Sequence, residues 1–235
     1  LAVTDDGARL LVQARAMVDA AASGLEELAD RGRELSGQLS ITMPAVMAQT
    51  VVTERIARFA MAHPNIRLTL DFSDNRRELI GAGFDVAVRM GWLKDSALKA
   101  RKLFDLDRYL VAAPDYVQDR APPGTPRDLE GWDWMELSPV PLKPRFTLPN
   151  GKTTSIRPTP RLNANDAQAL RHLARSGAGL AILPDRLVRR DIADGHLIHI
   201  RPDWTLDQIG VYVVWPPNAP KGGLIAHLVT ALAGK

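Results

Sequence analysis

Three short groups of residues carry the chemistry that this sequence offers. They are residues 44–50, 73–75 and 165–166, and each follows a predicted strand and opens a predicted helix. The first turn of a helix leaves backbone N–H groups unpaired and carries a partial positive charge, so it favours carboxylates and other anions. Ligands of open α/β sheets bind beyond the carboxyl ends of the strands. Helix capping explains any one of these groups alone, but three together indicate a small-molecule binding site.

The sequence contains no motif for catalysis, metal binding or cofactor binding. It has no cysteine and five histidines, of which only His196 and His199 are close together. Residues three apart on a strand point to opposite faces, which argues against a shared metal ion. No G-x-S-x-G, P-loop or H-E-x-x-H motif occurs, and Gly177-Ala178-Gly179 is better explained as a helix stop than as a dinucleotide-binding loop. We therefore expect neither an enzyme nor a metal or cofactor site.

The first half of the chain alternates strands and helices. The predicted elements are a strand at 39–43, a helix from 51 that ends before Pro64, a strand at 66–72, a short helix around 79–80 and a strand at 84–89. The strands alternate apolar with polar side chains, and an apolar stripe from Val51 to Phe59 marks the longer helix. Ser73 and Asp74 can cap the short one. This order predicts a parallel α/β sheet with right-handed crossovers.

A proline-rich stretch after residue 113 interrupts this pattern and marks a boundary. Beyond it we expect a strand at 134–137, a hairpin across the turn at 149–152, a strand at 161–164, a helix capped by Asn165, strands at 180–183 and 209–215, and a closing helix at 224–232. Gln168 stands where the partner of a capping box belongs, and Gly177 to Gly179 ends that helix. The strand at 209–215 is so apolar that both faces need cover, which predicts its return to the first sheet.

Residues 5–35 carry apolar or small side chains at alternating steps of three and four, the pattern of a heptad seam. The seam consists of Leu11, Ala14, Val18, Ala21, Leu25, Leu28, Gly32 and Leu35. Thr4 and the two acids after it favour a helix that begins near residue 5. Such a helix either packs on its own domain or pairs with a second helix. Alanine at alternate seam positions favours the second interpretation.

The formal net charge of +3 does not mark a nucleic-acid-binding surface, because the basic residues are spread along the chain. Residues 1–35 contain seven acids and four arginines, a net charge of −3. The basic clusters at 76–77, 99–102 and 186–190 are typical of solvated faces. This chain alone should bind DNA weakly. No apolar run is long enough to span a membrane, and a cytoplasmic location fits the absence of cysteine.

Five stretches together resemble a LysR-type transcriptional regulator. They are LAVTDDGARLL at 1–11, GQLSITMPA at 37–45, AHPNIRLTLDFSD at 62–74, LIGAGFDVAVRMG at 79–91 and LNANDAQALRHLARSGAGLAILP at 162–184. Their order and spacing match across essentially the whole chain. The combination of GFDVAVRMG with a later GAGLAILP is the more specific part of the resemblance.

The resemblance implies an α/β fold of two Rossmann-like subdomains, built like a periplasmic binding protein and preceded by a long N-terminal linker helix. The expected bounds are 1–37 for the linker and dimerisation helix, 38–112 plus 209–235 for effector subdomain I and 113–208 for effector subdomain II. LAVTDDGARLL looks like the end of a winged helix-turn-helix domain that is missing from this chain.

The resemblance also implies an effector site between the two subdomains. The expected site residues are Thr42, Met43, Ala45, Met47, Ser73, Asn75, Arg89, Ser138, Asn163, Asn165 and Asp166. Arg89 would pair with an anionic effector or form a surface salt bridge. Asp166 departs from a simple anion site, because its charge favours an effector with an amine or a hydroxyl group.

Three partners follow from the resemblance: a small organic acid or aromatic metabolite as effector, further copies of the chain in a dimer or tetramer, and DNA through the missing domain. The effector would shift the population of conformations and with it the spacing of the DNA-binding domains. A free-standing solute-binding protein is an alternative, although it normally carries an export signal and does not need a heptad helix. A small-molecule enzyme on an α/β scaffold is a third possibility, since fold does not determine function.

Overall fold

The computed structural model describes residues 14, 17–18, 35–74, 83–91, 97–138, 142–220 and 222–234. The chain divides into two compact units, unit 1 with residues 1–103 and 212–235 and unit 2 with residues 104–211. Of the predicted linker helix, residues 14, 17 and 18 are described, and they are helical. The rest of that prediction lies outside the described residues.

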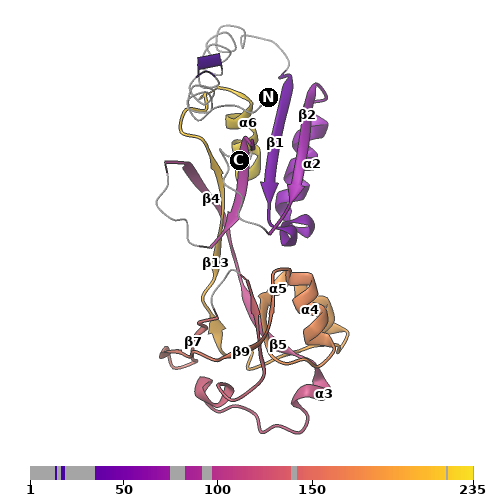
Figure 1. The fold of residues 1–235 in the computed structure, drawn as a ribbon, viewed down its shortest axis with the longest axis vertical. Coiled ribbons are helices and arrows are strands. Elements are labelled where there is room, and N and C mark those ends of the chain that lie inside the picture. The colour runs from indigo at the N-terminus through magenta and orange to yellow at the C-terminus, as the bar shows by residue number, and fades with distance from the viewer. Residues whose placement is uncertain are drawn as a thin grey trace, which may run out of the picture. The chain divides into compact units, whose positions relative to one another are not determined.

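Unit 1 is built on a five-stranded sheet in the order β2-β1-β3-β13-β4 (Figure 1). The strands are β1 (Gly37–Met43), β2 (Ile66–Phe72), β3 (Val86–Met90), β4 (Lys99–Leu106) and β13 (Ile209–Trp215). Strand β1 runs parallel to β2 and β3, so the carboxyl ends of these strands meet at one edge. The predicted strands at 39–43, 66–72 and 84–89 are confirmed. So is the return of 209–215 to the first sheet.

Among the described residues of unit 1, helices α2 (Val51–Ala62) and α6 (Leu224–Ala233) both contribute side chains to the core. Helix α2 buries Val52, Ile56 and Phe59, as the apolar stripe predicts, and its C-cap His63 directly precedes the proline. Helix α6 packs against α2 and β1 and buries its own apolar side. The predicted short helix around 79–80 lies outside the described residues.

Unit 2 combines a parallel strand pair with antiparallel strands. Its strands are β5 (Arg108–Ala112), β6 (Trp134–Leu137), β7 (Arg145–Thr147), β8 (Thr153–Ser155), β9 (Pro160–Ala164), β10 (Ala181–Pro184), β11 (Ile198–His199) and β12 (Thr205–Leu206). Strands β6 and β9 are parallel, while β5 pairs antiparallel with β10 and β11. The predicted hairpin across 149–152 is confirmed, with β7 and β8 as its arms.

Four short helices surround these strands. They are α3 (Pro114–Val117), the 3-10 helix η2 (Pro126–Leu129), α4 (Ala167–Arg175) and α5 (Asp185–Ala193). The core of unit 2 is centred on large buried side chains, among them Trp134, Phe146 and Leu129. The Trp134 indole N–H also donates a hydrogen bond of 2.7 Å to the Leu129 carbonyl, which satisfies the polar end of a buried ring.

The division between the units falls at 103/104 and 211/212, whereas the sequence placed the boundaries at 112/113 and 208/209. Strand β5 accounts for the first difference. It was assigned to effector subdomain I, but it pairs with β10 and β11, which both belong to unit 2. Strands β4 and β13 each cross a boundary without a break, so no loop or change of composition marks the crossing.

The glycines after α4 end that helix, as predicted. Gly177 has a φ of 79°, and the Ala178 N–H turns back to the Leu173 carbonyl at 3.1 Å. Gly179 lets the chain pass close to its neighbour, because a Cβ atom there would lie 2.3 Å from the Asp133 carbonyl oxygen. The two backbones are joined at this point by a hydrogen bond of 2.8 Å from the Leu180 N–H to the same oxygen. These residues therefore have a structural function and form no dinucleotide-binding loop.

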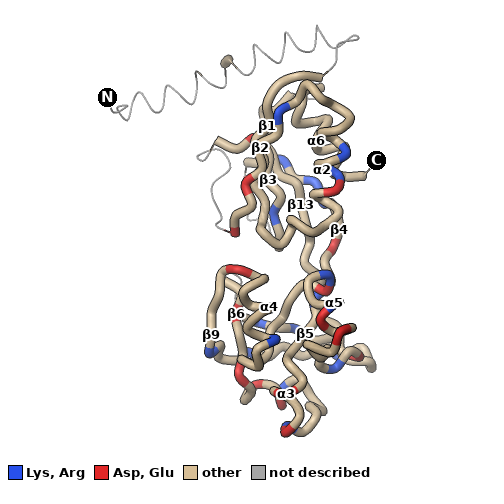
Figure 2. The backbone as a smooth tube through the Cα atoms, turned by 90° about the vertical axis from the view of Figure 1, so that its right-hand side faces the viewer, with Lys and Arg blue, Asp and Glu red and all other residues tan. Residues whose placement is uncertain are grey.

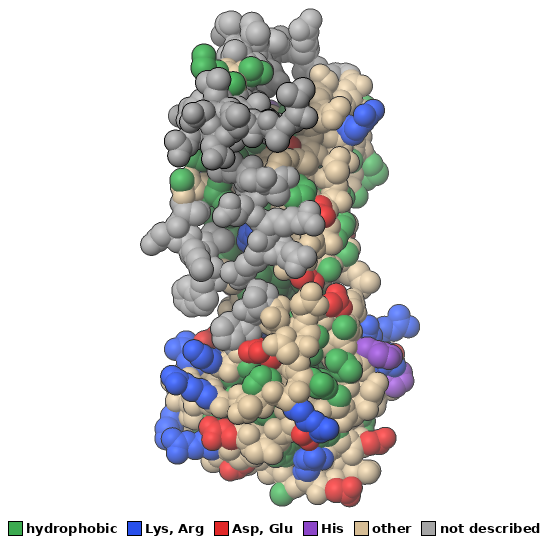
Figure 3. Space-filling view, in the orientation of Figure 1, with side chains coloured by type: hydrophobic (Ala, Val, Ile, Leu, Met, Phe, Trp, Pro, Cys, Tyr) green, Lys and Arg blue, Asp and Glu red, His purple; other side chains and the backbone are tan. Residues whose placement is uncertain are grey.

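Lys and Arg are interspersed with Asp and Glu along the described backbone (Figure 2) and on the coloured part of the surface in Figure 3. In the basic cluster at 186–190, Arg189 lies 2.6 Å from Asp185 and Arg190 lies 3.6 Å from Asp194, in each case one helical turn away. Acids of the same helix therefore balance part of the cluster. This arrangement fits a solvated helix face.

Candidate functional site

In unit 1 the candidate residues gather where β1 and β2 end. Thr42 on β1 is paired in register with Asp71 on β2, and its hydroxyl donates a hydrogen bond of 3.0 Å to the Asp71 carboxylate. Just past the ends of the two strands, the Ala45 N–H donates to Oδ1 of Asp74 at 3.1 Å. Two neighbouring parallel strands therefore end in a polar group that contains two carboxylates.

The candidates Met43 and Met47 have buried side chains. Both side chains have no exposed surface and belong to the core of unit 1. A 3-10 helix, η1 (Ala45–Gln49), precedes α2, and Met47 is its buried residue. Met47 is also anchored through its carbonyl, which accepts a hydrogen bond of 2.9 Å from the Thr50 hydroxyl. Both thioether side chains fill the interior, and a contact of either methionine with a ligand stays a prediction.

The remaining candidates of unit 1 are Ser73, Asn75 and Arg89. The Ser73 N–H donates a hydrogen bond of 2.9 Å to the Met43 carbonyl, which ties the chain beyond β2 to the end of β1. Arg89 lies on β3, and its guanidinium donates to the Val88 carbonyl at 3.3 Å. Asn75 lies outside the described residues. A contact of Arg89 with an anionic ligand stays a prediction.

In unit 2 the candidate residues lie at the carboxyl ends of β6 and β9. These strands are parallel, with Glu136 opposite Asn163, and the Ser138 N–H extends their pairing by donating 2.8 Å to the Ala164 carbonyl. The Asn163 side-chain amide donates a hydrogen bond of 2.9 Å to Oε2 of Glu136. As in unit 1, two neighbouring parallel strands end in a polar group with a carboxylate.

Helix α4 begins directly after this group, and its capping residue differs from the prediction. The N-cap is Asp166, whose Oδ1 accepts the Ala169 N–H at 2.6 Å. Asn165, the predicted cap, is an exposed residue one position earlier. Gln168 does not close a capping box, because its side-chain oxygen accepts a hydrogen bond from Arg171 instead. The Asp166 carboxylate caps one N–H group of the first turn, and the Asn165 side chain is exposed at the surface.

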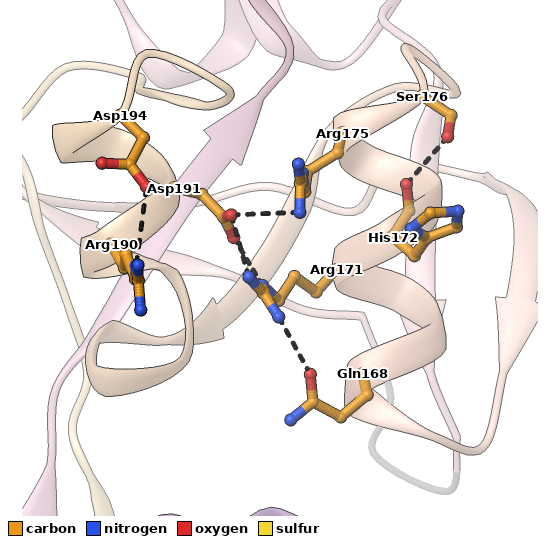
Figure 4. A network of polar contacts seen from close by, with 8 residues as sticks. All are labelled: Gln168, Arg171, His172, Arg175, Ser176, Arg190, Asp191 and Asp194. Atoms are coloured by element: carbon orange, nitrogen blue, oxygen red, sulfur yellow. Dashed lines mark hydrogen bonds and ion pairs between the residues drawn. The ribbon is translucent and has the colours of Figure 1, made fainter.

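A buried ion-pair network attaches α4 to α5 (Figure 4). The Asp191 side chain is 2% exposed and accepts two hydrogen bonds from Arg171, one from Nε and one of 2.8 Å from Nη2. Arg175, one turn further along α4, lies 3.4 Å from the same carboxylate. The hydrogen bond from Arg171 lowers the pKa of Asp191 and raises that of Arg171. The network holds α4 in place, and with it the candidate residues at its N-terminus.

Sequence reasoning missed the carboxylates of Asp71 and Glu136, and it named Asp74 only as a cap of the predicted short helix. Asp71 and Glu136 lie near the carboxyl ends of predicted strands, so the position of polar residues at strand ends was the available signal. An ionised carboxylate only accepts hydrogen bonds. Within each unit, these carboxylates, and in unit 2 also that of Asp166, suit a ligand group that donates hydrogen bonds, such as a hydroxyl or an amine.

Within the described parts of the chain, no group of three or more histidine, aspartate or glutamate residues is placed to hold a metal ion. The helices described there include none that is long and apolar enough to cross a membrane.

The chain is similar to transcriptional regulators. A family model described as the LysR substrate binding domain matches residues 32–235. The HTH-type transcriptional regulator PtxR of Pseudomonas aeruginosa is 32% identical over 217 residues, which cover 92% of this chain and 70% of PtxR. The HTH-type transcriptional regulator CrgA of Neisseria meningitidis serogroup B is 29% identical and shows similar coverage, 88% of this chain and 70% of CrgA. These relatives are regulators and not enzymes, as the sequence predicts for this chain.

Solved structures of such regulators share the fold. The full-length structure of the Vibrio cholerae virulence activator AphB, a member of the LTTR protein family, matches with a TM-score of 0.72 and 25% identity over 99% of this chain and 80% of AphB. The regulatory domain of CrgA from Neisseria meningitidis matches with a TM-score of 0.67 and 29% identity over 84% of this chain and 98% of that domain. The predicted α/β fold of two subdomains is therefore confirmed.

Proposed function

Because the chain belongs to the LysR-type transcriptional regulators and carries their substrate-binding domain, we propose that it senses a small-molecule effector with residues of both units. The observation that carries this proposal is a repeated arrangement. In unit 1 the parallel strands β1 and β2, and in unit 2 the parallel strands β6 and β9, end in hydrogen-bonded polar groups. Carboxyl ends of parallel strands are where open α/β sheets bind ligands.

The chemistry of these groups favours an effector with two kinds of polar atom. The carboxylates of Asp71, Glu136 and Asp166 accept hydrogen bonds and attract a hydroxyl or an amine, and Arg89 is the partner for a carboxylate of the ligand. The proposed effector is therefore a small organic acid or an aromatic metabolite that also carries a hydroxyl or amino group. Thr42, Ser138 and Asn163 supply further polar contacts in this proposal.

Regulation follows if the effector binds two conformations unequally. The proposed mechanism is a population shift that changes the geometry of a dimer or tetramer, and with it the spacing of winged-helix domains that precede this region. The heptad seam in residues 5–35 would supply the pairing between subunits. A protein that reads DNA in this way acts in the bacterial cytoplasm. A free-standing solute-binding protein is not favoured, because the similar proteins are named as transcriptional regulators.

A thermal unfolding screen with hydroxy acids, amino acids and aromatic acids tests the proposal. A ligand at a hundred times its Kd stabilises the folded state by about 2.7 kcal/mol and raises Tm by a few degrees. Asn165→Ala and Arg89→Ala should remove the shift produced by a hit and leave the dimer mass unchanged. Asn218→Ala, at an exposed loop position outside both groups, is the matched control. A hit that keeps its full shift in both site variants would contradict the assignment.

A further inference from the structure

Unit 2 contains a pocket that none of the candidate effector residues lines. It has a volume of about 180 Å³ and lies between the chain that follows α3 and the chain around β11. Six of its lining residues are apolar, namely Val117, Pro122, Pro123, Trp132, Ile198 and Ile200. An apolar cavity of about 150 Å³ accepts benzene. The pocket therefore has room for one six-membered ring.

The other lining residues are all bases. Arg120, His199 and Arg201 complete the wall, and the lining includes no acid. Burial lowers the pKa of His199, so this ring is neutral at pH 7 and the two guanidinium groups provide the positive charge. The carboxylates that pair with these guanidinium groups, Asp133 and Asp203, lie outside the lining, so a ligand in the pocket would meet guanidinium N–H donors and no acid. The pocket therefore favours an anion.

Arg120 is held at the pocket by aromatic rings. Its guanidinium carbon lies 3.8 Å from the centroid of the Tyr116 ring and 5.6 Å from that of the Trp132 ring. The guanidinium also donates to the Tyr116 carbonyl, and it lies 3.8 Å from the Asp133 carboxylate, whose side chain is outside the lining. These contacts orient the charge before any ligand arrives, which reduces the entropy lost on binding.

The Arg201 guanidinium makes more hydrogen bonds than that of Arg120, and its backbone has a conformation that few residues other than glycine adopt. Its φ is 50°, and among the described residues it alone combines a positive φ with a side chain other than hydrogen. The guanidinium carbon lies 4.6 Å from the Trp204 ring centroid, and the group donates to both oxygens of Asp203, at 2.9 and 2.6 Å, and to the Pro123 carbonyl at 2.8 Å. These bonds use three of its five N–H donors. Such backbone strain persists where surrounding contacts enforce it, and it is frequent at ligand-binding positions.

We propose that this pocket is a second small-molecule site, which binds a carboxylate carried on a single apolar ring. The carboxylate contacts the guanidinium groups of Arg120 and Arg201, and the ring lies against Trp132 and Ile198. Charge-assisted hydrogen bonds fix the polar end, while ring stacking and apolar contact fix the other. The site lies within unit 2 and shares no residue with the candidate effector groups, so it stands or falls independently of the proposed function.

Titration of the whole chain with benzoate, followed by calorimetry and by NMR of the tryptophan indole N–H groups, tests the site. Benzoate should bind with a Kd of about 1 mM or tighter and shift the indole signal of Trp132. Benzamide, which has the same ring without the charge, should bind at least about tenfold more weakly. Equal binding of the two compounds would overturn the anion assignment. An unchanged Trp132 indole signal at saturating benzoate would overturn the location.

Two substitutions of opposite charge at one position of the pocket wall supply the matched variants. Ile198 is 38% exposed and lies on β11 at the edge of its sheet, so the fold tolerates a polar residue there. Ile198→Glu should abolish benzoate binding through repulsion, whereas Ile198→Lys should retain it. Arg201→Gln should weaken binding at least about tenfold, and Arg127→Gln, an exposed position outside the pocket, should not change it. Equal affinity of the Glu and Lys variants for benzoate would refute the proposal.

Discussion

At the scale of single residues, Thr42 shows how the end of a strand becomes polar without weakening the core. Its side chain is 1% exposed, yet its hydroxyl has a partner in Asp71 on the neighbouring strand. A buried hydroxyl without a partner destabilises a fold, so the threonine and the aspartate depend on each other. At the end of the strand pair in unit 2, by contrast, Asn163 is exposed, and its hydrogen bond to Glu136 lies at the surface.

Thr42→Val should lower the free energy of unfolding by about 1–2 kcal/mol, because the shape is kept while the hydrogen bond to Asp71 is lost. Thr42→Ser retains the hydroxyl and should lose less. Urea denaturation of both variants measures the difference. Equal stability of the valine variant and the parent would show that the hydrogen bond does not contribute.

Gly179→Ala should destabilise the chain by about 2 kcal/mol or more, because φ is 138° and the new Cβ would lie 2.3 Å from the Asp133 oxygen. Gly177→Ala is the matched control. It has a φ of 79° with open space around the new atom, so it meets only the left-handed backbone penalty of about 1 kcal/mol. Thermal unfolding of the two variants separates close approach from backbone conformation. A larger loss of stability in Gly177→Ala than in Gly179→Ala would contradict the prediction.

At the scale of elements, the relation between α4 and α5 decides where the candidate residues at 165–166 lie. Both helices are only nine residues long, and isolated helices of that length are unstable in water. Packing and the network around Asp191 must therefore hold them. Two arginines of α4, one turn apart, reach the same buried carboxylate, which determines both the distance and the rotation of α4 relative to α5.

Asp191→Asn should destabilise the chain by about 3–5 kcal/mol, because it leaves the Arg171 guanidinium partly buried without its counter-charge. Asp194→Asn, which removes an exposed pair on the same helix, should cost less than about 0.5 kcal/mol. Guanidinium chloride denaturation at pH 7 provides the comparison. A similar loss in both variants would contradict a special role for the buried pair.

The network also predicts a pH dependence. Its hydrogen bonds lower the folded-state pKa of Asp191 from the ordinary 3.8, so its stabilising contribution is complete above that value and is lost as the pH falls through the lowered pKa. The unfolding free energy of the parent chain should therefore decline at acidic pH, below about 4. In Asp191→Asn this decline should be shallower. Parallel acid titrations of stability in the two proteins measure the difference in slope.

At the scale of the whole molecule, self-association is predicted from residues 5–35, whose seam has the 3.5-residue period of paired helices. Removal of residues 1–35 should lower the oligomeric state, while the two units, each with its own core, stay folded. Light scattering gives the mass, and circular dichroism checks the fold. An unchanged mass would favour the alternative in which this helix packs on its own domain.

Much of the fold is determined by local sequence. The alternation in 39–43 and 66–72, the apolar stripe ended by Pro64 and the glycines after α4 predicted these elements, because period and backbone restrictions act over a few residues. The return of 209–215 to the first sheet was also predictable, since a strand apolar on both faces needs cover on both. The family resemblance depended on the order of such segments along the whole chain.

Only the tertiary structure decided which of these segments contact one another and which side chains they bury. Burial of Met43 and Met47, the pairing of β5 with β10, and the carboxylates beside Thr42 and Asn163 all depend on residues distant in sequence. Asp166 rather than Asn165 caps α4, because two adjacent residues compete for one helix end and their packing selects between them. The period and spacing of apolar residues indicate which side chains share a face of a helix or strand. Which side chain of another element they contact is decided only when the chain folds.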